Sequence, residues 1–259
     1  MKEVRRRALL FVAGSLTVVL ISCVSSCRRA SVDPFSREWT KLAYEPLQGA
    51  QILEAAAGSK CVWRVDEDPA SKGIRINATA QTANKYMEEV RLQTEAGTLV
   101  GTNHGEWGGG LSLIDAKVST AQHILDKNVL QLLPVRSGVL VLTGLRHLDL
   151  DEGALWLYEK NSTGSWSIRK LADLDVEPSF ASSVGRDIFV VDHRGVSRLD
   201  QALNIRRIAS LPLDDLRPVS VAEDAQGRIY LGMNAFVVRL VPSDSGYVQE
   251  WFTKPGCLP

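Results

Sequence analysis

The chain has 259 residues, of which 45% are hydrophobic and 23% charged, a composition typical of a globular protein with its own core. Thirty Lys and Arg residues balance thirty Asp and Glu residues, so the formal net charge is zero at pH 7. This balance argues against nucleic acid as the main partner, because proteins that bind nucleic acids usually carry an excess of basic residues. The composition also excludes a disordered or multi-pass membrane protein.

The N-terminus predicts a secretory leader. Four basic residues within the first seven precede an apolar run over residues 8–21. A basic region followed by a short apolar run is the pattern of a signal peptide. The run is shorter than the ~20 residues that cross a bilayer comfortably, so we expect the rest of the chain to be exported.

The leader ends in Leu20-Ile21-Ser22-Cys23, which resembles the bacterial lipobox. The resemblance implies that residues 1–22 are removed, and that Cys23 becomes the first mature residue and carries acyl chains such as palmitate. It implies a lipid-anchored protein of the cell envelope that faces the periplasm or the exterior. Val24, in place of an Asp, resembles the outer-membrane sorting class of Gram-negative lipoproteins. An uncleaved signal anchor and simple secretion are the alternatives.

Residues 23–45 are predicted to form a polar tether, because charged residues and Ser dominate and no periodicity is visible. Residues 47–57 predict a short helix that Gly58 ends. Loss of residues 1–22 removes four basic residues and one acidic residue, which leaves 26 and 29 and a net charge of −3. We therefore expect membrane contact through the lipid anchor alone, and no nucleic-acid partner.

The cysteines predict one disulfide. Cys61 and Cys257 lie at opposite ends of the globular part, and export places them in an oxidising compartment. We expect them to pair, the alternative being two buried free thiols; Cys27 is left free or pairs between molecules. Because Cys23 and Cys27 lack a second pair at zinc spacing, the sequence predicts neither a metal site nor a cofactor.

From residue 86 onward, short apolar runs alternate with turns rich in Gly, Asp, Asn and Ser. Measured from Val100 to Val141, Val190 and Leu231, the runs are spaced by 41, 49 and 41 residues. A propeller blade of about 40–45 residues gives such a period. Residues 86–253 resemble the loosely defined propeller-repeat superfamily, without a Trp-Asp or kelch signature.

Four units are visible, and residues 60–65 with 73–76 predict the hairpin of a degenerate fifth. The prediction for residues 46–259 is therefore an all-β domain, a small β-propeller of four to five blades. Even strand spacing also suits a β-sandwich, which is the alternative. In the propeller, a disulfide between Cys61 and Cys257 ties the first blade to the last and closes the ring.

The most unusual stretch is the glycine-rich segment 101–110, which contains His104, Glu106 and Trp107. One interpretation is a ligand-contacting loop, in which Trp107 stacks and the two polar side chains bind. Glu106 would be a general base if His104 oriented it. The other interpretation is a glycine-enabled turn that packs Trp107 between blades. His193, in a later turn, is the fourth candidate ligand-binding residue.

We expect a membrane-tethered lipoprotein that acts as a binding or scaffold module for a protein, peptide or glycan. One alternative is an exported lyase or hydrolase of a small molecule or saccharide, with His104, Glu106 and His193 near one pocket. Another is an immunity or inhibitor protein. The sequence contains no Gly-x-Ser-x-Gly, His-Glu-x-x-His, Gly-Lys-Ser/Thr or Gly-x-Gly-x-x-Gly motif. Convergence of these side chains on one pocket distinguishes the enzyme, because catalysis needs its groups within reach of one substrate.

Overall fold

The computed structural model describes residues 33–35, 37–42, 56, 58–71, 73–80, 89–115, 120–211, 213–214 and 216–258. The leader, with Cys23, and most of the helix predicted at 47–57 lie outside these residues; Ala56 is helical and buried. Within the described part, no helix is long and apolar enough to cross a membrane.

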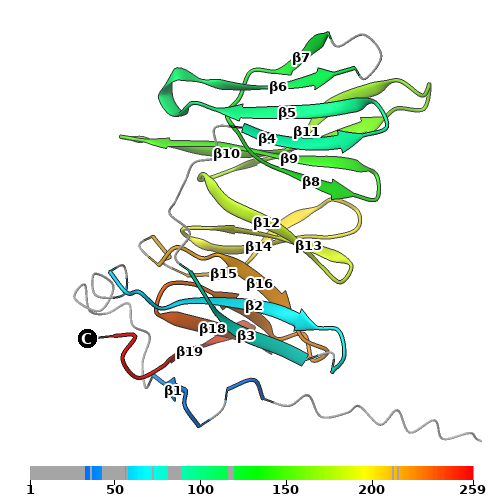
Figure 1. Cartoon of the computed structure of the whole chain (residues 1–259). Coiled ribbons are helices and arrows are strands. Elements are labelled where there is room, and N and C mark those ends of the chain that lie inside the picture. The colour runs from blue at the N-terminus through cyan, green and yellow to red at the C-terminus, as the bar shows by residue number, and fades with distance from the viewer. Residues whose placement is uncertain are drawn as a thin grey trace, which may run out of the picture. The chain divides into compact units, whose positions relative to one another are not determined.

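Four antiparallel meanders of four strands each, here called blades 1 to 4, make up most of the described chain (Figure 1). Blade 1 contains β4 (Glu89–Thr94), β5 (Gly97–Asn103), β6 (Gly109–Ile114) and β7 (Ala121–Leu125). Blade 2 contains β8 (Val129–Val135), β9 (Gly138–His147), β10 (Leu150–Lys160) and β11 (Trp166–Leu174). Blade 3 contains β12 (Pro178–Val184), β13 (Asp187–Asp192), β14 (Gly195–Leu199) and β15 (Ile205–Ser210). Blade 4 contains β16 (Ser220–Glu223), β17 (Ile229–Gly232), β18 (Phe236–Ser243) and β19 (Gly246–Thr253).

The turn signals in the sequence lie at the first hairpin of each blade. Gly138, which opens β9, has a φ of 151°, in a region that favours glycine. A Cβ at this position would lie 2.2 Å from the carbonyl oxygen of Tyr158 on β10. Glycine is therefore required here both for the backbone angle and for the close approach of the neighbouring strand.

Neighbouring blades cover one another's faces. In β9, Val141 lies in the core between blades 1 and 2, whereas Leu140 and Leu142 lie in the core between blades 2 and 3. Successive strand residues point to opposite faces, so a strand buried on both sides carries an unbroken apolar run. In β13, likewise, Val190 lies in the core between blades 2 and 3, and Phe189 lies in the core between blades 3 and 4.

The first strands of successive blades lie next to one another: β8 contacts β4 and β12, and β12 contacts β16. Consecutive four-stranded meanders joined through their first strands are the arrangement of propeller blades. The prediction of an all-β, small β-propeller is confirmed, and the two-layered β-sandwich is wrong because the described strands form successive sheets.

The degenerate fifth unit is also present. β2 (Val62–Asp68) and β3 (Gly73–Thr79) form a two-stranded sheet, and β2 lies against β16, β17 and β18 of blade 4. Trp63 and Val65 of β2 pack with Tyr230 of β17 in a shared core. The predicted closure of the ring is not seen in the described residues, because β2 and β3 make no extensive contact with blade 1 and Figure 1 shows the two at opposite ends of the series of sheets.

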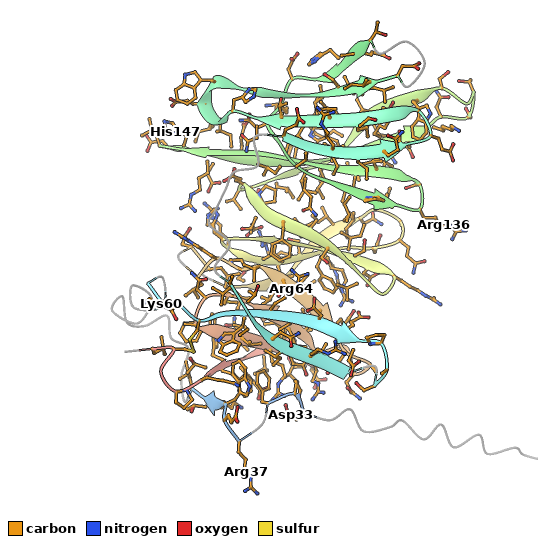
Figure 2. All side chains as sticks on the ribbon, viewed as in Figure 1. Asp33, Arg37, Lys60, Arg64, Arg136 and His147 are labelled. Atoms are coloured by element: carbon orange, nitrogen blue, oxygen red, sulfur yellow. A yellow bond between two sulfur atoms is a disulfide. The ribbon has the colours of Figure 1, made fainter. Side chains whose placement is uncertain are left out.

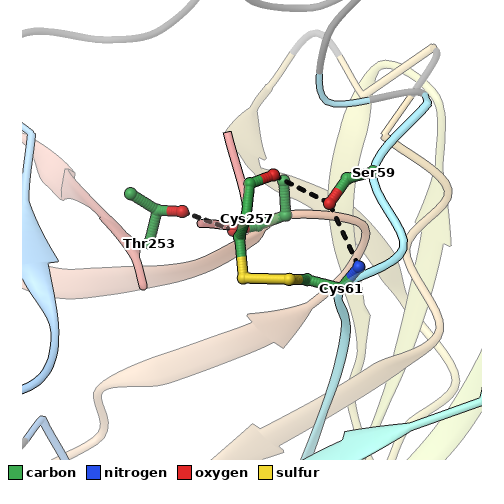
Figure 3. Close-up of a disulfide and its surroundings, with 5 residues drawn as sticks. Ser59, Cys61, Thr253 and Cys257 are labelled. Carbon is green, nitrogen blue, oxygen red and sulfur yellow. Dashed lines mark hydrogen bonds between the residues drawn. A yellow bond between two sulfur atoms is a disulfide. The ribbon is translucent and has the colours of Figure 1, made fainter. Parts of the chain in front are cut away.

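The predicted disulfide between Cys61 and Cys257 is confirmed (Figure 3). Cys61 precedes β2 and Cys257 follows β19, so the bridge joins the two-stranded unit to blade 4. The buried Ser59 hydroxyl donates to the carbonyl oxygen of Cys257 at 2.8 Å and accepts from the backbone N–H of Cys61 at 3.1 Å. The polar groups beside the bridge are thus satisfied within the fold.

Part of the segment predicted as a tether packs onto blade 4. β1 (Thr40–Lys41) pairs with β19, and the Phe35 ring stacks on Phe252 with 3.5 Å between centroids. Arg239 donates to Asp33 at 3.0 Å, and its guanidinium lies over both rings. The described residues 33–35 and 37–42 therefore belong to the folded domain.

We predict that replacing both Cys61 and Cys257 with Ser strongly destabilises the domain. The bridge closes a loop with a sequence separation of 196 residues. In the loop-entropy account a closure of this length stabilises by about 5 kcal/mol, which corresponds to roughly 10–20 °C in Tm. Thermal unfolding of the oxidised protein, the reduced protein and the double variant measures the effect. Equal Tm values for the oxidised protein and the double variant would contradict it.

Candidate functional site

One edge of the blades gathers the candidate residues. In an up-and-down meander the second and fourth strands end at the same edge, so the β5–β6, β9–β10 and β13–β14 turns share an edge with the connections between blades. We call this edge the loop face; it comprises residues 103–109, 145–151, 175–178, 192–195, 211 and 213–214. Figure 2 shows His147 and Arg136 at opposite ends of blade 2, which distinguishes the loop face from the other edge.

The β5–β6 turn is a short 3-10 helix, η2 (Gly105–Trp107), held in a fixed position. The buried Asn128 donates from its side chain to the carbonyl oxygen of Gly105 at 2.7 Å. Gly105 has a φ of 61°, where a side chain would be strained. Trp107 is 84% exposed, so the interpretation that it packs between blades is wrong.

Three of the four predicted site residues converge. His104, Glu106 and Trp107 line one depression of about 510 Å³, together with Arg146 and His147 of β9 and Glu177 of the next connection. Glu106 Oε2 lies 2.7 Å from His147 Nε2, a contact from blade 1 to blade 2. The expectation that His104 orients Glu106 is therefore corrected, because His147 is the imidazole that faces this carboxylate.

His193, the fourth predicted residue, lines a neighbouring depression of about 530 Å³. Its Nε2 lies 3.2 Å from Asp151 Oδ2 and 3.9 Å from Asp214 Oδ1. Arg146 lines both depressions and lies 2.9 Å from Asp214. The two depressions are thus adjacent and share one guanidinium group, but His193 is not in the depression of the other three residues.

Glu177 is the site residue that the sequence did not indicate. It lies between β11 and β12 and is half-buried. Its backbone N–H donates to the Asp151 carboxylate at 2.8 Å. Its own carboxylate has no hydrogen-bond or ion-pair partner among the described residues. Burial and, to a lesser extent, the negative charge of Asp151 raise the pKa of Glu177 to about 7, opposed by Arg146. A lone Glu before a Pro in a connection gives no periodic signal, which explains why it was missed.

Exposed apolar side chains also gather here. Over the described residues, the exposed large hydrophobic side chains are Trp107, Leu148, Leu150 and Val248. The first three, here called the apolar rim, lie on the loop face, and Leu148 is 90% exposed at the tip of the β9–β10 hairpin. The same hairpin carries three carboxylates, Asp149, Asp151 and Glu152. The described residues contain no group of three or more His, Cys, Asp or Glu able to hold a metal ion.

No protein-family model matches this chain, and no curated protein does either. Among solved structures, a streptogramin B lyase is similar at 11% identity and a TM-score of 0.38, covering 84% of this chain and 73% of that one. Regucalcin from Agrobacterium tumefaciens is similar at 14% identity and 0.36, covering 78% and 77%. A gluconolactonase from Xanthomonas campestris is similar at 16% identity and 0.36, covering 78% and 71%.

We predict that Glu177 makes the stability of the domain depend on pH. Its pKa is about 7 in the folded protein and 4.5 in the unfolded chain, so the folded state holds the proton more tightly. The contribution of Glu177 to the free energy of unfolding should then be greatest below pH 4.5 and fall as the pH rises to about 7. Urea unfolding at pH 5 and pH 8 measures the difference, which Glu177→Gln should reduce. An unchanged pH dependence in this variant would contradict the assignment.

Proposed function

We propose that the protein is a membrane-tethered, exported binding module that receives a protein or peptide on its loop face. The observation that carries the proposal is the apolar rim beside two adjacent depressions. Exposed apolar side chains clustered near concave surfaces mark interaction sites more often than scattered ones do. Trp107, Leu148 and Leu150 come from two loops that the contact between Glu106 and His147 holds together.

The tether in this proposal is short. The lipobox resemblance supports lipid attachment at Cys23, and Asp33 contacts Arg239 of blade 4. The nine residues 24–32 reach at most ~30–32 Å when fully extended. A partner in or near the same membrane would therefore meet the domain within this distance.

An exported lyase or hydrolase is the second candidate, favoured by one specific observation. Glu177, with a pKa of about 7, lines the same depression as His104 and the pair of Glu106 and His147. A carboxyl group with such a pKa is suited to give or take a proton at neutral pH. Turnover that Glu177→Gln abolishes, with partner binding retained, would favour this candidate over the binding module.

We predict that the loop face contacts the partner in native membranes. A photo-crosslinking amino acid at position 107 or 148 should give the same discrete crosslinked product, whereas position 248 should not, although Val248 is 55% exposed. Trp107→Ala should reduce the product from position 148 by about tenfold or more, as expected for an aromatic anchor. Equal crosslinking from all three positions would contradict a loop-face site.

We predict that Cys23→Ser releases the protein from membranes. One thioether-linked diacylglycerol and an acylated amine provide several chains, and their loss removes most of the membrane affinity. Membrane fractionation with metabolic labelling by a fatty acid measures both retention and acylation. Retention of an unlabelled variant would contradict lipidation at this residue and favour a signal anchor.

A further inference from the structure

We infer that the loop face docks a partner segment in which a basic side chain stands between apolar side chains. This inference rests on the binding function proposed above and names its partner class. It combines the apolar rim with the charge of the depression beside it. The two loops that carry the apolar rim also line the depressions, so one short segment can contact both features together.

Contacts within and between its two loops hold the apolar half of the surface together. The Asn128 side chain fixes η2, and the contact between Glu106 and His147 joins η2 to the β9–β10 hairpin. Leu148 has a φ of 52°, in the left-handed region, and its side chain is 90% exposed. A large apolar side chain in this conformation at a hairpin tip costs the free protein stability, which is consistent with a side chain that contacts a partner.

The charges beside the rim favour a cationic group. The carboxylates that line the two depressions outnumber the guanidinium groups; they are Glu106, Asp151, Glu177 and Asp214, against Arg146 and Arg194. Arg146 lies 2.9 Å from Asp214, and Arg194 lies 3.9 Å from Asp151. Of the two remaining carboxylates, Glu106 contacts His147. Glu177 accepts no hydrogen bond from any described residue. An anionic group is therefore disfavoured at this end of the surface.

Glu177 provides the direct contact. A guanidinium or ammonium group offers N–H donors and a positive charge. A half-buried carboxylate that accepts no hydrogen bond needs a partner with both of these features. The groups near it are Arg146 and His147 from β9, Asp151 from β10, and His104 and Glu106 from the η2 loop. A bound cation would lower the pKa of Glu177, so binding releases a proton near neutral pH and strengthens as the pH rises from 6 to 8.

The experiment uses three fluorescent capped peptides that differ in one residue. Each carries two leucines around a central arginine, a citrulline, which is its uncharged near-isostere, or a glutamate. Binding to the mature domain is measured by fluorescence anisotropy at pH 6 and pH 8. We expect the arginine peptide to bind at least about tenfold more tightly than the citrulline peptide, since a charged hydrogen bond separates them.

Two carboxylate variants locate the contact. Glu177→Gln should abolish the preference for arginine and its increase with pH. Glu95→Gln, at an exposed carboxylate in the β4–β5 turn on the opposite edge, should change neither. Trp107→Ala should weaken the binding of every peptide that contacts the loop face.

The outcomes separate this inference from the proposed function. Equal binding of the three peptides, with loss of all three in Trp107→Ala, would overturn the basic partner and leave the binding module standing. Tight arginine binding that Glu177→Gln leaves unchanged would also overturn the inference. Binding that neither Glu177→Gln nor Trp107→Ala affects would overturn both, because the loop face would not be the contact surface.

Discussion

The structure depends on one constraint: each four-stranded blade has two apolar faces, and only neighbouring blades can cover them. The middle strands show this most clearly, because adjacent residues such as Leu140 and Val141 enter different cores. Blades 2 and 3 therefore each pack between two other blades, and the first strands come together along β4, β8, β12 and β16. At the end of the series, blade 4 is covered by β2 and β3, and the disulfide holds this smaller unit in place.

This packing also decides where chemistry is possible. A fully apolar strand has no position for a functional side chain, so polar and charged groups concentrate at the strand ends. Because strand direction alternates, the turns after the second strands and the connections between blades lie at the same edge. Glu106, His147, Glu177 and His193 are separated by up to 87 residues in sequence, and this rule places all four on the loop face. Contacts across blades, such as that of Glu106 with His147, join their loops into one surface.

The sequence predicted those features that repeat or that depend on composition. The spacing of apolar runs gave the blades, the turn glycines gave the hairpins, and the paired positions of Cys61 and Cys257 gave the bridge. The glycines around Trp107 indicated an unusual loop, and three of its residues share a depression. Each of these signals lies within a short segment or follows a period.

Features that depend on contacts between distant segments were not predicted. Phe35 stacks on Phe252, and Arg239 binds Asp33, over separations of more than 200 residues. The partner of Glu106 is His147 and not the nearby His104, because the tip of the longer β9–β10 hairpin reaches η2. Glu177 acquires its raised pKa only from the burial and charge that the fold creates around it. No local pattern encodes such an environment.

The central claim, that one edge of the blades is the functional face, is tested most directly by hydrogen–deuterium exchange. The exchange of the protein in native membranes, where the proposed lipid anchor would hold it, is compared with that of the purified protein alone. The account predicts slower exchange in native membranes at residues 103–109 and 145–151, with unchanged exchange at the turns of the opposite edge, residues 136–137 and 161–165. Protection confined to the opposite edge, or the absence of any difference, would contradict it.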